Sequence, residues 1–105
     1  MNAMKYQLVL QLPASSLKDY DEMIEFEATI IKHLGGVGVV DAHDMGSGET
    51  NIFILTDEPK LSFERIEAFL GTKDFMVNLK AAFREIGVNN FTILHPPNLK
   101  HFTVA

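Results

Sequence analysis

Two segments rich in β-forming residues, 37–44 and 50–56, are separated by only Met45-Gly46-Ser47-Gly48-Glu49. A link that is this short and contains glycine joins neighbouring antiparallel strands, because a parallel crossover needs about a dozen residues or more. The sequence therefore predicts a β-hairpin in the middle of the chain. Every other element has to be arranged around it.

Four further segments show strand or helix patterns on either side of the hairpin. They are a strand over 6–12, a helix from Ser15 or Ser16 to about Leu34, a helix in two parts over 59–70 and 73–86, and a strand over 91–95. Residues 6–12 alternate between apolar and polar, as in a half-buried strand. The helices are expected to begin at capping side chains (a serine, then Asp57) and to end at glycines such as Gly35.

The order strand, helix, strand, strand, helix, strand predicts an α+β fold. Two right-handed crossovers give a ferredoxin-like split βαβ sandwich (βαββαβ, with its second helix broken in two). Its four-stranded antiparallel sheet has the order 4-1-3-2, with the helices on one face. We expect a single domain over 5–105, with no assignment for 97–105. Residues 1–3 precede a second methionine, Met4, and fit either a cloning scar or a native start.

Charge and composition exclude several classes of function. The chain has a formal net charge of −5 and no cysteine. An acidic chain does not suit the phosphate backbone of a nucleic acid, and without cysteine there are no disulfides, thiol nucleophiles or iron–sulfur clusters. No segment resembles a membrane span or a signal peptide, so we expect a cytoplasmic protein. No cofactor, metal or catalytic motif is predicted.

The turn of the hairpin holds the first candidate site. Its candidate binding residues are His43, Asp44, Gly46, Ser47, Gly48 and Glu49. Alternation along a strand would place Asp41 and His43 on one face and Asp44 on the other. The open interpretations are a metal or acid–base site, a loop that binds a ligand or partner, and a structural turn bonded to its own backbone. The glycines likewise fit a tight turn or an anion-binding nest.

A metal site within one chain is the least favoured of these interpretations. His95 is the obvious additional ligand, but the predicted topology places it on the opposite edge of the sheet from His43. Three strand spacings separate the two edges, about 14 Å.

Glu27 is the second candidate, because it breaks the pattern of its own helix. We expect the apolar face of that helix to consist of Tyr20, Met23, Ile24, Ile30, Ile31 and Leu34, with Glu27 near its centre. A carboxylate there needs a partner, since an unpaired buried charge costs several kcal/mol. Arg65, Arg84 or a polar group on a strand could supply one. The alternatives are a structural pair, a position at the edge of the apolar face that an idealised helix places at its centre, and a carboxylate that lines a ligand pocket.

Acidic residues are concentrated in the first half of the chain. Residues 1–58 carry a net −7 and residues 59–105 a net +2. The acidic helix fits either a solvated face or a docking surface for a basic partner. Apolar side chains on the uncovered sheet face also predict a homodimer, through that face or an edge strand.

The favoured function is therefore a non-catalytic acidic binding module. It would recognise a protein partner, of an immunity or regulatory type, or a second copy of itself. The alternative is a small dimeric enzyme or ligand-binding protein with its site at the 43–49 loop or beside Glu27.

Residues 43–59, which begin His43-Asp44-Met45-Gly46-Ser47-Gly48-Glu49, resemble a signature of a family of small uncharacterised bacterial proteins. Residues 6–10 extend the resemblance into the first strand. It implies a stand-alone bacterial protein. The family has no known activity, so the resemblance assigns no role to these residues.

Overall fold

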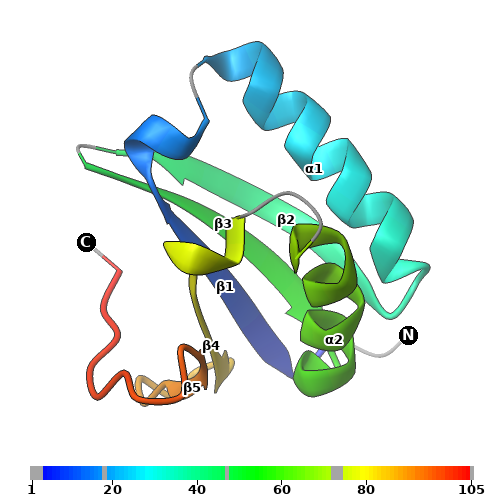
Figure 1. Ribbon diagram of the computed structural model, residues 1–105. Helices are drawn as coiled ribbons and strands as arrows, with labels where there is room; N and C mark the ends of the chain where they lie inside the picture. Colours follow the sequence, from blue (N-terminus) through cyan, green and yellow to red (C-terminus); the bar gives the residue numbers. More distant parts are fainter. Residues whose placement is uncertain (1–3, 18, 47, 72–74, 105) are drawn as a thin grey trace.

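The computed structural model describes residues 4–17, 19–46, 48–71 and 75–104. These residues form five strands, two α-helices and short 3₁₀ turns (Figure 1). In chain order the elements are β1 (Tyr6–Pro13), η1 (Ala14–Ser16), α1 (Tyr20–Leu34), β2 (Gly38–Met45), β3 (Glu49–Thr56), α2 (Pro59–Leu70), η3 (Phe75–Val77), β4 (Lys80–Glu85) and β5 (Thr92–His95). The question of a cloning scar at 1–3 lies outside the described residues.

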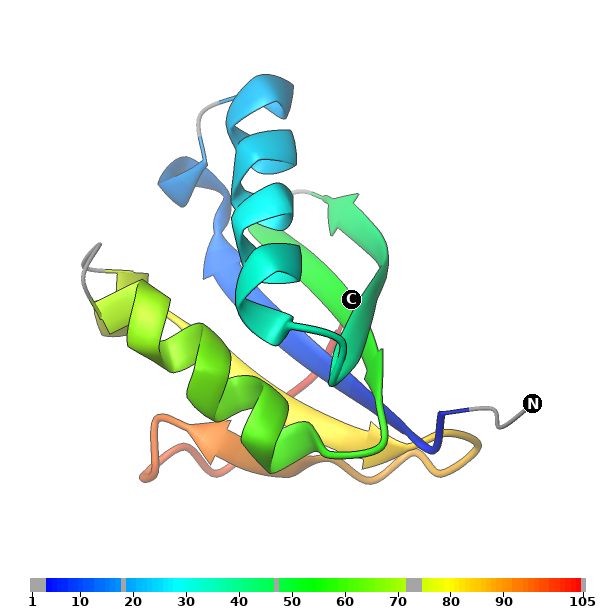
Figure 2. The same cartoon turned by 90° about the vertical axis from the view of Figure 1, so that its right-hand side faces the viewer.

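The strands form one antiparallel sheet in the order β2-β3-β1-β4-β5. Both α-helices lie on one face of it (Figure 2), so the predicted α+β class is confirmed. The predicted four-stranded sheet of order 4-1-3-2 is wrong. The first four strands in the chain do lie side by side in the order 4-1-3-2. The fourth strand, however, is Lys80–Glu85, which was predicted to be helical. The segment that was predicted as the fourth strand forms an additional edge strand, β5.

The predicted helix over 73–86 is wrong within its described part. Residues 75–77 form a 3₁₀ turn, and β4 then pairs with β1 on one side and β5 on the other. Its consecutive residues Ala81 and Ala82 are both fully buried, in clusters on opposite faces of the sheet. A strand that is buried on both faces loses the apolar–polar alternation, and alanine-rich sequence then resembles a helix.

α1 begins later than predicted, whereas α2 has the predicted bounds and differs only in its N-terminal cap. α1 starts at Tyr20 rather than at a serine, because the Asp19 side chain accepts a hydrogen bond from the Glu22 amide. Its C-terminal cap is Gly35 at φ +56°, as predicted. Asp57 does not cap α2 but accepts a bond from the Lys5 amide. No helix among the described residues is long and apolar enough to span a membrane.

The apolar face of α1 is rotated relative to the prediction. The helix buries Met23, Phe26, Ile30 and Leu34 against the sheet and α2. Three residues that were assigned to this face, Tyr20, Ile24 and Ile31, are exposed instead. Glu27 therefore lies at the edge of the buried face and not at its centre.

The C-terminal segment covers part of the sheet face opposite the helices (Figure 2). Phe102 is buried there in a cluster with Val9 and Ala82, and Leu99 and Val104 pack against the same cluster. The side chain of Gln11, which is also buried, donates to the Thr103 carbonyl at 3.0 Å. Part of the apolar sheet face that was expected to bind a second copy is thus covered by the same chain. The homodimer itself stays a prediction.

Candidate functional site

The structure brings two of the candidate residues together. Glu27 of α1 and His43 of β2 form a hydrogen bond of 2.9 Å between Oε2 and Nδ1. Their side chains are 12% and 26% exposed, respectively. A strand-borne polar partner for a mostly buried Glu27 is thus confirmed. The two arginines considered for this role bond elsewhere, Arg65 to the Leu34 carbonyl and Arg84 to Gln7 and the Val88 carbonyl.

A β-bulge at Asp41 brings His43 to the helix side of the sheet. Val40 pairs with Ile54 and His43 with Ile52, and both of these β3 residues belong to the core beneath the helices. Strict alternation would give Val40 and His43 opposite faces, but the register shifts between Val40 and Ala42. The prediction that Asp41 and His43 share a face fails for this reason, because a bulge inserts one extra residue.

The carboxylate controls the proton position on the imidazole. An ionised carboxylate only accepts hydrogen bonds, so Nδ1 of His43 carries the proton and a neutral ring leaves Nε2 as an acceptor. The Tyr20 ring lies beside this pair, 6.0 Å from the His43 ring between centroids. Carboxylate, imidazole and phenol are groups used in acid–base chemistry. The hollows at the start of α2, between Phe26 and Phe69, and beside Lys5 are lined by other residues.

The hairpin turn contributes little else to this pair. Asp44 is exposed and Glu49 partly buried, and within the described residues neither is joined to Glu27 or His43 by a hydrogen bond or ion pair. Gly48 adopts φ +91° and its carbonyl accepts from the Ala14 amide, as in a structural turn. Gly46 is exposed, and Ser47 lies outside the described residues.

A row of exposed apolar side chains runs along α1 on both sides of the pair. Tyr20, Ile24 and Ile31 are 60%, 42% and 55% exposed, and they share a helix face with Glu27 at spacings of three and four residues. Met45 is also exposed and lies two residues beyond His43, so its side chain is on the same face of β2. We call these four apolar residues, together with the Glu27–His43 pair, the α1–β2 flank. Sequence reasoning missed this surface because it assigned the α1 residues to the core.

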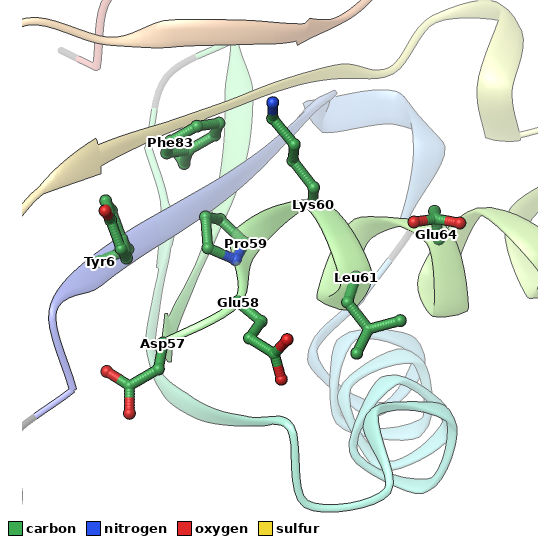
Figure 3. Close-up of a pocket in the computed structure, with 8 residues that line it drawn as sticks. All are labelled: Tyr6, Asp57, Glu58, Pro59, Lys60, Leu61, Glu64 and Phe83. Carbon is green, nitrogen blue, oxygen red and sulfur yellow. The ribbon is translucent and has the colours of Figure 1, made fainter.

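A second feature that the sequence analysis missed is a hollow of about 530 Å³ at the start of α2 (Figure 3). It is lined by Tyr6, Asp57, Glu58, Pro59, Lys60, Leu61, Glu64 and Phe83. The Tyr6 and Phe83 rings meet edge to face, 5.7 Å apart at 83°. The lining comes from β1, β4, α2 and the connection before α2, and only the fold brings these segments together, so no local motif could reveal the hollow.

The described residues contain no group of three or more metal-ligating side chains. His43 and His95 lie on β2 and β5, the two edge strands of the sheet. Comparisons with protein-family models, with curated proteins and with solved structures gave no match.

Proposed function

We propose that this protein is a non-catalytic binding module that recognises a basic protein partner through the α1–β2 flank. The observation that carries the proposal is the exposed row Tyr20, Ile24 and Ile31 on an otherwise acidic helix. Large apolar side chains that remain exposed in a row are typical of interaction sites, and tyrosine is enriched among the residues that dominate binding energy.

The charge around the row indicates the chemistry of the partner. Asp21 and Glu25 are exposed on the same helix. These carboxylates would form an acidic rim around an apolar centre, and a basic surface on the partner complements such a rim. Complementary charge speeds association and disfavours acidic competitors.

The Glu27–His43 pair supports a second candidate, a small enzyme or ligand-binding protein. An imidazole oriented by a carboxylate is suited to proton transfer. A substrate would have to lie beside Nε2 of His43. The exposed apolar row on α1, which a catalytic site at His43 does not explain, favours the binding module.

The test uses the exposed apolar row with a matched control. Ile24→Glu adds a charge within the flank, whereas Val88→Glu adds one at a residue outside the flank with nearly equal exposure, 41% against 42%. Tagged chains are used to capture proteins from a lysate of the source cells, and quantitative mass spectrometry compares the captured sets. We expect basic proteins that wild type and Val88→Glu retain and Ile24→Glu loses. Identical sets for all three chains would contradict the proposal.

Salt dependence separates a basic partner from a second copy. Carboxylates on two copies of the flank repel each other, so salt would strengthen a homodimer formed there and weaken a complex with a basic protein. Static light scattering of the pure chain at low and high salt tests the homodimer. A mass of two chains supports it, and a mass of one chain at both salt concentrations contradicts it.

A further inference from the structure

We infer that the hollow at the start of α2 binds the ammonium group of an aliphatic amine. This site is separate from the α1–β2 flank and does not depend on the proposed function. Figure 3 shows the two aromatic rings beside Pro59, with carboxylates from Asp57, Glu58 and Glu64 at the margin.

The aromatic pair provides the wall that an amine needs. Tyr6 and Phe83 are each only partly buried and both border the hollow. Aromatic faces attract ammonium groups, and the same faces, with Pro59 and Leu61, pack against methylene groups. A ligand with a charged end and an apolar stem therefore fits this wall better than a fully polar one.

The carboxylates determine the sign of the charge. The lining holds three acids, Asp57, Glu58 and Glu64, and one base, Lys60, so it carries a net −2. Asp57 and Glu58 lie where the positive end of the α2 dipole already favours acids. Glu64, in the second turn of the helix, is exposed, and no described residue forms an ion pair with it, including Lys60 four residues earlier. An anion is thus disfavoured and a cation favoured.

The hollow also restricts the type of cation. Its volume of about 530 Å³ lies within the range of small-molecule sites. An inorganic ion is not indicated, because the described residues contain no group of three or more metal-ligating side chains. The bound cation is therefore an organic amine, either a free molecule or a lysine side chain.

The test is an NMR titration of the full chain with cadaverine, a free diamine, and with Nα-acetyl-lysine methylamide, which represents a lysine side chain. We expect saturable shifts at the Tyr6 and Phe83 rings and upfield shifts of the ligand methylenes. Glu64→Gln should weaken binding about threefold, as expected for one exposed ion pair. Glu67→Gln is the matched control, because it removes the same charge from an exposed residue of α2 outside the hollow.

Stronger binding of cadaverine would identify free amines as the ligand class. Stronger binding of the lysine derivative would identify the ligand as a lysine side chain of another protein. Non-saturable shifts, or equal weakening by Glu64→Gln and Glu67→Gln, would overturn the inference, since both indicate nonspecific attraction to an acidic helix. Both variants are at exposed positions, so loss of folding does not confound the comparison.

Discussion

The hydrogen bond between Glu27 and His43 is neither fully exposed nor fully buried. The Glu27 side chain is 12% exposed and the His43 side chain 26%. Glu27 has lost most of its contact with water, so its bond to His43 replaces hydration instead of adding to it. The pair joins α1 to β2, an edge strand of the sheet.

Truncation of Glu27 tests the stabilising role of this pair. Glu27→Ala should lower the free energy of unfolding by about 1–2 kcal/mol, because the bond to His43 involves a charged, mostly buried acceptor. Glu27→Gln should cost less, since its carboxamide oxygen still accepts from Nδ1. Urea denaturation measures both variants. Glu25→Ala, at an exposed position of α1, should change stability by no more than about 0.5 kcal/mol, and an equal effect at both positions would rule out a stabilising pair.

Gly35 is a second position where a single atom matters. A Cβ there would lie 2.9 Å from Nη1 of Arg65, at a residue with φ +56°. Gly35→Ala should destabilise the protein by about 1–2 kcal/mol because of its left-handed backbone. Gly71→Ala is the control, since that glycine has φ −61° and its Cβ would meet no described atom within 4 Å. Thermal unfolding should show a lower Tm for the first variant and an unchanged or higher Tm for the second.

At the scale of elements, the sequence predicted those whose patterns are local. β1, the hairpin and both α-helices were found because alternation, turn residues and helix-capping glycines lie within the segments themselves. β4 was missed because its burial comes from distant partners, β1, β5 and the C-terminal segment. Intrinsic helix preference of Lys80–Glu85 was overridden by this pairing, as tertiary context commonly does.

One substitution made in two elements tests the strand assignment. Glu85→Thr in β4, opposite Tyr6 of β1, should raise stability by about 0.5 kcal/mol, because threonine is favoured in strands. Glu67→Thr in α2 should lower it by about 0.5 kcal/mol, because threonine is disfavoured in helices. Guanidinium titrations of both variants should therefore give changes of opposite sign. A loss of stability at both positions would favour a helix over 80–85.

For the whole molecule, the sequence indicated one layer of helices on a sheet but not what lies on the other face. Apolar side chains were expected on that face, and a second copy was expected to cover them. The cover that the structure shows is a segment without regular secondary structure, which periodicity cannot detect. The site followed the same pattern. Glu27 and His43 were each chosen from the sequence, but their meeting depends on a bulge that has no sequence signal here.

Removal of the Phe102 side chain tests the contribution of this cover. Phe102→Ala should lower the free energy of unfolding by about 3 kcal/mol, because a buried ring that packs 4.9 Å from the Phe91 ring is lost. Val77→Ala, at a side chain that is 81% exposed, should be almost neutral. Chemical denaturation of both variants gives the comparison. A small effect of Phe102→Ala would mean that the C-terminal segment contributes little to the fold.

The bulge at Asp41 makes β2 sensitive to an unusual kind of genetic change. Before the bulge the side chain of Val40 is on the helix side of the sheet, and after the bulge that of His43 is. Most substitutions at an exposed residue such as Asp41 are tolerated. Loss of its codon, however, would remove the bulge and restore strict alternation of side chains along the whole strand. One half would then have to turn its side chains over, and either Val40 would leave the core or His43 would leave Glu27. A one-codon deletion in the exposed 87–90 turn would have no comparable consequence, so an in-frame library should be depleted of deletions at position 41 while tolerating its substitutions.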